Sequence, residues 1–206
     1  MAGRNIMLVL AALCCPMAAL AQAPLAFQCP LQGVSVEYDT GTRSVFGGPD
    51  PTDSAICLVR TGTNDRRMLY AFWTLPLSHN DAERSARAGL AQLYPATVGK
   101  ASSFELFLPR AGGGDDPYRE TWRVLRFEPV TVRAGTLNAM VIERVQEGQG
   151  TNTFKGTWTR WIDVNSRVVI KQTFELGRGR MPANQQWEAT ALRVPPPAQP
   201  APRPRG

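Results

Sequence analysis

Histidine is almost missing from this 206-residue chain, which contains one copy, His79. A Ser-His-Asp hydrolase would have to use His79 as its base, and the chain has no Gly-x-Ser-x-Gly turn to present the serine. Zinc sites with several imidazole ligands are excluded for the same reason. The sequence therefore predicts no catalytic triad and no metal centre, and it shows no motif for a cofactor.

Lysine is nearly as scarce, since three lysines stand against 20 arginines in a chain of formal net charge +6. The arginines are spread along the chain and do not form the clustered basic stretch that is typical of nucleic-acid binding. In an exported protein, this charge favours anionic envelope surfaces over nucleic acid as partners. A codon preference for arginine would give the same composition, so both explanations stay open.

A long apolar run is also missing. The first residues carry one basic residue, Arg4, then an apolar run over Ile6–Leu13 and the small residues Ala19 and Ala21. This is the pattern of a secretory signal peptide (1–21), and it is shorter than the roughly 20 apolar residues that span a bilayer. We predict cleavage after Ala21, a periplasmic or secreted product, and no transmembrane segment in the mature chain.

Cysteine is reduced to two copies, Cys29 and Cys57, once the leader is removed. Neither belongs to a Cys-x-x-Cys motif, which argues against a redox pair. An even pair of cysteines in an exported chain is most simply a disulfide. We therefore predict a Cys29–Cys57 bond that joins two neighbouring strand regions.

The mature chain has the length of one domain. Residues 22–194 are predicted to form a single β-rich domain. Residues 195–206 are rich in proline and poor in apolar residues, which predicts an extended, disordered tail.

One segment has helical periodicity. Residues Asn80–Tyr94 begin with a capping-box pattern, in which Asn80 is the cap and Glu83 follows three residues later. Capping also explains the acidic residues here without a metal shared with His79. Leu90 and Leu93 lie on the apolar face and are predicted to pack against a sheet.

Short β-rich runs separated by turn residues occupy the rest of the domain, before and after this helix. They predict an α+β fold that is predominantly antiparallel β: a large, curved, half-barrel-like meander sheet packed on one main helix. Near the end of the meander, a strict period of two places Val168, Ile170 and Phe174 on its core face.

Two strings near the centre carry a resemblance. VTVRAGTLNAMVIER at 130–144 and GTWTRWIDV at 156–164 resemble exported bacterial proteins of unknown function that have an AGTF-type turn and a W-(Y/V)-D hairpin. The resemblance covers about Tyr118–Leu176. More remotely, the order of elements looks like the lipoprotein-carrier superfamily, which implies a β half-barrel closed by helices. Gly135 is expected to adopt a positive φ in the turn of the first string.

Tryptophan and arginine give the candidate site. Trp122, Trp158, Arg160 and Trp161 lie in predicted strands. On a concave sheet, such residues can bind an amphiphile or an anionic glycan through apolar contact and charge-assisted hydrogen bonds. Strand tryptophans also fill ordinary cores, so the structural explanation stays open.

Carboxylate pairs in two turns leave an enzyme as the alternative. Asp50 and Asp53 form one pair, and Asp115 and Asp116 form the other. Aspartate is common in such turns because its side chain bonds the backbone. The preferred interpretation is a non-enzymatic envelope protein that binds a lipid, a glycan or a partner protein on a curved sheet; an envelope enzyme and a structural assembly subunit are the alternatives.

Overall fold

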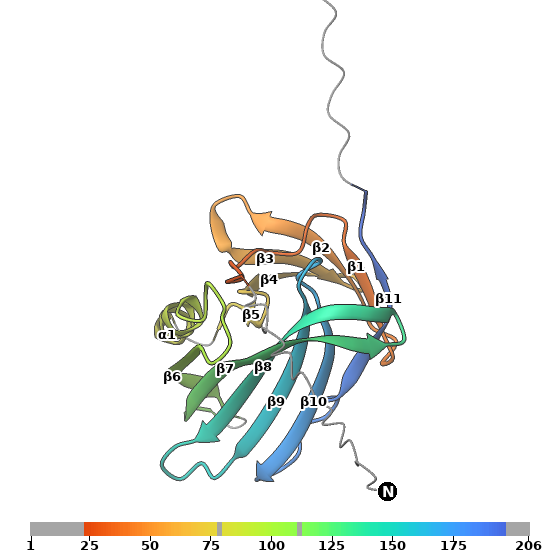
Figure 1. Cartoon of the computed structure of the whole chain (residues 1–206). Helices are drawn as coiled ribbons and strands as arrows, with labels where there is room; N and C mark the ends of the chain where they lie inside the picture. The colour runs from red at the N-terminus through yellow and green to blue at the C-terminus, as the bar shows by residue number, and fades with distance from the viewer. Residues whose placement is uncertain (1–22, 78–79, 111–112, 197–206) are drawn as a thin grey trace, which may run out of the picture.

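The computed structural model describes residues 23–77, 80–110 and 113–196. In these residues the chain forms one open sheet of eleven antiparallel strands and one helix (Figure 1). The large antiparallel sheet expected from the sequence is confirmed, and its curvature is consistent with a half-barrel. The predicted leader, His79 and residues 197–206 of the predicted tail lie outside the described residues.

The elements follow one another in the order β1 (Ser35–Tyr38), β2 (Arg43–Asp50), β3 (Asp53–Thr61), β4 (Asn64–Leu69), β5 (Trp73–Leu75), α1 (Asn80–Ala91), β6 (Ala101–Pro109), β7 (Asp115–Val132), β8 (Gly135–Gly148), β9 (Lys155–Asp163), β10 (Val169–Arg178) and β11 (Trp187–Arg193).

The sheet consists of two meanders joined at one ladder. Strands β1 to β5 pair in chain order, and so do β6 to β11. The two meanders, which we call the N-terminal and C-terminal arms, are joined where β1 pairs with β11, for example Val36 opposite Leu192. The two edges of the sheet are therefore β5 and β6, and α1 lies beside β6 in the connection between them (Figure 1).

The helix packs its small-residue face on the sheet. Ala82, Ala86 and Leu90 are fully buried, and the prediction that Leu90 and Leu93 are buried is confirmed. They belong to a core cluster with residues of the C-terminal arm: Leu106, Trp122, Val124, Met140, Ile142 and Ile162. The helix ends at Ala91, earlier than expected, because the next three N–H groups bond carbonyls three residues back in a tighter turn.

A second core cluster involves the turn between β7 and β8. The ends of these strands cross in front of β9 and β10 and reach β11 (Figure 1), where the Ala134 N–H donates to the Ala189 carbonyl at 3.0 Å. Gly135 has φ +126°, as the turn pattern predicted. The turn thus completes a core with apolar residues of β1, β2, β3 and β10.

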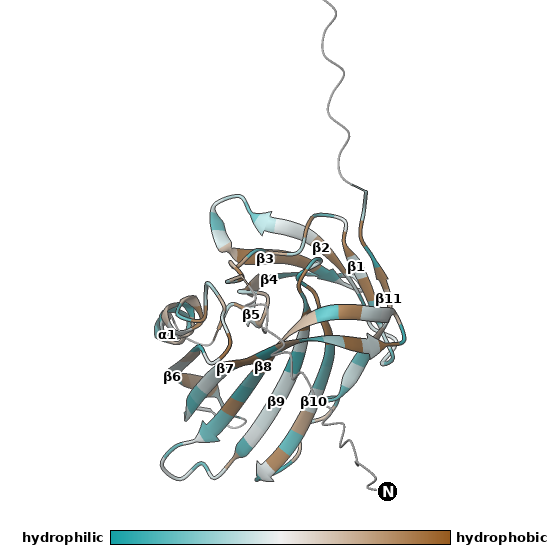
Figure 2. Ribbon diagram, in the orientation of Figure 1, coloured by the Kyte–Doolittle hydropathy of each residue, from teal (hydrophilic) through white to brown (hydrophobic). Residues whose placement is uncertain are grey.

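Val168, Ile170 and Phe174 are all buried, as period two predicted, but the prediction that they share one face is wrong. The ladder between β9 and β10 shifts register between Val169 and Lys171. Val168 and Ile170 therefore join the second core cluster, whereas Val169 packs on the first. Beyond the shift, burial alternates up to Phe174, which is buried as predicted. Hydrophobic and hydrophilic residues alternate only near the end of β10 (Figure 2), because residues 171–173 are all hydrophilic.

A turn splits the run MLYAFW at 68–73, which has the pattern of one strand. Tyr70 and Ala71 have φ values of 50° and 60°, and a strand cannot continue through two left-handed residues. The ring of Tyr70 is held there by Phe27 at 4.7 Å and by Tyr94 at 5.9 Å between centroids. Strand β4 therefore ends at Leu69.

The predicted disulfide is confirmed: Cys29 is bonded to Cys57 on β3, with their α-carbons 5.4 Å apart. It ties the segment that precedes β1 to the N-terminal arm. A bond of this kind is typical of proteins that mature in an oxidising compartment. Within the described ranges, the helix is too short and too polar to cross a bilayer.

Candidate functional site

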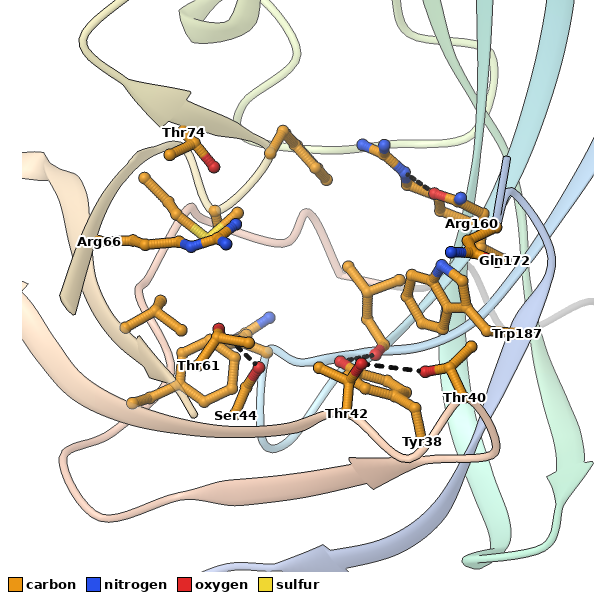
Figure 3. Close-up of a pocket in the computed structure, with 18 residues that line it drawn as sticks. Tyr38, Thr40, Thr42, Ser44, Thr61, Arg66, Thr74, Arg160, Gln172 and Trp187 are labelled. Atoms are coloured by element: carbon orange, nitrogen blue, oxygen red, sulfur yellow. Dashed lines mark hydrogen bonds between the residues drawn. The ribbon is translucent and has the colours of Figure 1, made fainter. Parts of the chain in front are cut away.

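A cavity of about 490 Å³ lies between the two arms of the sheet (Figure 3). Strands β1 to β5 line one side of it, and residues of β9, β10 and β11 line the other. Its size falls in the range of roughly 300–1,000 Å³ that is usual for small-molecule pockets. The cavity exists because β1 pairs with β11, which makes the two arms face each other.

Apolar side chains form much of the wall. Those in contact with the space are Phe46, Val59, Met68, Phe72, Val169 and Trp187. Trp187 is fixed edge-on against the ring of Tyr38, with 4.5 Å between centroids. A wall of this kind favours contact with hydrocarbon. When a hydrocarbon chain covers the wall, the apolar surfaces of the wall and of the chain both leave water, which is favourable.

Hydroxyl groups line a second part of the wall. The Tyr38 hydroxyl donates to the Val169 carbonyl at 3.0 Å, and the hydroxyls of Ser44 and Thr61 lie 3.1 Å apart. Burial raises the pKa of Tyr38, so this hydroxyl stays neutral. Figure 3 shows Thr40 and Thr42 beside it. The wall is therefore amphipathic.

Arginines supply the charge of the cavity. Arg66, Arg160 and Arg167 all line it, and no aspartate or glutamate does in the described part of the chain. Figure 3 shows Arg66 and Arg160 on opposite walls. One Nη atom of Arg167 is buried without a hydrogen-bond partner in the described residues.

Arg160 is fixed in position by a short chain of hydrogen bonds. Its Nε donates to Gln172 Oε1 at 2.7 Å, and Gln172 Nε2 donates to the Gln185 carbonyl at 2.8 Å. Burial lowers the pKa of Arg160 to about 9, with a further decrease from the neighbouring Arg144, so the group is still protonated at neutral pH. A pKa lowered in this way means that nearby anions do not fully offset the loss of water around the guanidinium.

A buried ion pair lies beside the cavity wall. Arg144 binds Glu120 through two hydrogen bonds of 2.8 Å each, and Gln146 donates a third of 2.8 Å to the same carboxylate. The Arg144 guanidinium also lies 4.3 Å from the ring centroid of Trp73 and 4.4 Å from that of Trp158. This cluster satisfies Glu120 and fills the core.

The four residues proposed as a site from the sequence occupy three environments. Arg160 lines the cavity. Trp122 and Trp158 are buried beside it in the packing around Arg144, and Trp158 Nε1 donates to Gln185 Oε1. Trp161 is half-buried, and its Nε1 donates to Glu128 at 2.9 Å outside the cavity. The structure thus brings together only part of the predicted set.

Several cavity residues were missed by sequence reasoning, notably Tyr38, Phe72 and Gln172. Gln172 could have been found, because it lies directly opposite Arg160 in the antiparallel ladder. Tyr38 and Phe72 come from the other arm, and no local pattern places them near Arg160. Only the β1–β11 pairing does so.

The turn carboxylates have structural partners where their surroundings are described. Asp50 accepts hydrogen bonds from the backbone and hydroxyl of Thr52, which lower its pKa together with Arg67. Asp53 pairs with Arg87 at 2.8 Å. Among the described residues, no three His, Cys, Asp or Glu side chains are grouped as a metal site would require.

Comparison with known proteins identifies no relative of this chain. No protein-family model, no curated protein and no solved structure matched the chain.

Proposed function

We propose that this protein is an exported, non-enzymatic envelope protein that binds an amphiphile in the cavity between the two arms of its sheet. The cavity itself carries the proposal: about 490 Å³ with apolar, hydroxyl and cationic walls. An amphiphile matches this arrangement because its tail can contact the apolar wall while its head meets the polar groups.

The place of action follows from separate observations. The N-terminal sequence has the pattern of a signal peptide, and the Cys29–Cys57 bond suits an oxidising compartment. We therefore assign the mature protein to the periplasm or the medium. In both places the ligand would be a lipid of the cell envelope or a related amphiphile.

An uncharged naphthylamine dye, which becomes fluorescent in apolar surroundings, tests the binding function directly. We expect the purified mature protein to increase its fluorescence with saturable, 1:1 stoichiometry. Native mass spectrometry of protein purified from its own host should also show a non-covalently bound lipid. A dye titration without saturation would contradict amphiphile binding.

Two matched substitutions locate the bound dye. Thr74 is an exposed strand residue that lines the cavity, whereas Thr131 is an exposed strand residue that does not. Thr74→Trp places a bulky ring at the cavity and should weaken dye binding. Thr131→Trp makes the same chemical change elsewhere and should leave it unchanged; equal effects of the two would contradict this location.

A further inference from the structure

The charges next to the cavity do not balance, although Arg160 is half-buried and only Arg144 and Glu120 are buried. Two arginines, Arg144 and Arg160, lie close enough to affect each other, and one buried glutamate, Glu120, lies with them. Glu120 is taken up by Arg144 and Gln146 at 2.8 Å. One positive charge therefore remains, and it belongs to Arg160.

The geometry leaves the two Nη nitrogens of Arg160 available to a ligand. Only its Nε has an acceptor, Gln172 Oε1, among the residues that the structure describes. Its guanidinium is held 5.6 Å from the ring centroids of both Phe72 and Trp122. The side chain is therefore oriented before a ligand arrives, and its Nη nitrogens keep their capacity to donate.

The rest of the cavity also favours a negative ligand. Arg66 and Arg167 line it with Arg160, and no carboxylate lines it within the described ranges. Cations that are removed from water cost free energy unless an anion or strong acceptors compensate them. A ligand that brings the anion would remove this cost, which a neutral ligand cannot do.

We propose that the ligand is an anionic amphiphile whose carboxylate or phosphate head group binds the Arg160 guanidinium while its tail occupies the apolar part of the cavity. This inference rests on the proposed function. A guanidinium can donate two parallel hydrogen bonds to either oxyanion, so a free fatty acid and a phospholipid share the chemistry.

Displacement of the uncharged dye by a matched series of decyl compounds, below their micelle concentrations, tests this assignment. The series is decanoate, decyl phosphate, decanol and decyltrimethylammonium. We expect the anions to displace the dye at concentrations roughly tenfold or more below that of decanol, as charge-assisted hydrogen bonds would give. Stronger displacement by decanoate would indicate a fatty acid, and stronger displacement by decyl phosphate a phospholipid.

Variants test whether Arg160 is the group responsible. Arg160→Gln should remove the preference for anions while decanol still displaces the dye, and Arg160→Lys should keep part of that preference. Arg123→Gln makes the same charge change at an exposed position outside the cavity and should keep all of it. Dye binding by each variant shows that its cavity is intact.

The outcomes separate the inference from the function on which it rests. Dye binding with equal displacement by all four decyl compounds would overturn the anionic ligand and leave amphiphile binding intact. The same holds if the Arg160→Gln protein keeps the full preference. Absence of saturable dye binding in the unsubstituted protein would instead overturn the proposed function.

Discussion

Two arginine–glutamate pairs in this protein have nearly the same geometry and very different exposure. Arg144–Glu120 and Arg126–Glu128 are each joined by two hydrogen bonds of 2.8 to 2.9 Å. The side chains of the first pair are 9% and 0% exposed, and those of the second are 48% and 31% exposed. Water competes for the second pair only.

Truncating the arginine of each pair should therefore have unequal effects. Arg144→Ala leaves Glu120 buried without its cation, and we expect the free energy of unfolding to fall by roughly 3 to 5 kcal/mol. Arg126→Ala should change it by about 1 kcal/mol or less, since exposed pairs contribute little. Urea unfolding followed by tryptophan fluorescence measures both, and similar losses would contradict the assigned role of burial.

At this scale, period two could have removed Trp161 from the site that the sequence predicted. It separates Trp161 from Trp158 and Arg160 along β9, and the structure places Trp161 outside the cavity accordingly. The same pattern cannot tell a cavity wall from a packed core. Whether Trp122 and Trp158 are open depends on Arg144, which lies over both rings from the neighbouring strand β8.

At the scale of elements, α1 approaches the sheet at Gly89. A β-carbon built on Gly89 would overlap the ring of Phe104 on β6. The sequence gives no sign of this contact, because glycine within a helix is ordinarily a poor helix former and nothing more. The close approach becomes visible only when β6 is placed beside the helix.

This contact predicts a reversal of the usual effect of alanine in a helix. Gly89→Ala should improve helix propensity by about 1 kcal/mol, yet the overlap with Phe104 should cost more, so that the protein loses roughly 1 to 3 kcal/mol of stability. Thermal and urea unfolding would measure the change. Adding Phe104→Leu should restore part of the loss; a Gly89→Ala protein more stable than the original would contradict this packing.

The register shift in β10 shows a second limit at this scale. The apolar pattern of Val168, Ile170 and Phe174 is compatible with one regular strand. Pairing with β9 inserts an irregularity between Val169 and Lys171, which moves the first two residues to another core. A bulge depends on the partner strand as well as on the sequence that contains it, so the local pattern does not reveal it.

At the scale of the whole molecule, the strands and the helix could largely be predicted, but the cavity could not. Turn residues mark most strand ends, and the curved antiparallel sheet follows from their number and spacing. The cavity depends on the contact between β1 and β11, which are separated by most of the domain. Such non-local pairing is not encoded in any short segment.

The segment that precedes β1 contacts both the N-terminal arm and the residues that follow α1. Leu25 exchanges two backbone hydrogen bonds with Ala96, at 2.9 and 2.7 Å, and Phe27 packs on Tyr70 and Tyr94. The Cys29–Cys57 bond then fixes the segment to β3. A single short segment therefore connects the N-terminal arm to the region just after α1.

Breaking the disulfide should weaken this connection mainly by freeing the unfolded chain. A loop closed over 28 residues contributes roughly 3 to 4 kcal/mol by the chain-entropy argument. Urea unfolding with and without a reductant should show that loss, with a larger dependence on urea because the reduced unfolded chain is less compact. The Cys29→Ser/Cys57→Ser protein should have the same stability as the reduced protein, and adding the reductant should not change that stability. Because both cysteines are buried, part of any loss beyond this range would come from packing; equal stability with and without the bond would contradict its role in holding the segment to β3.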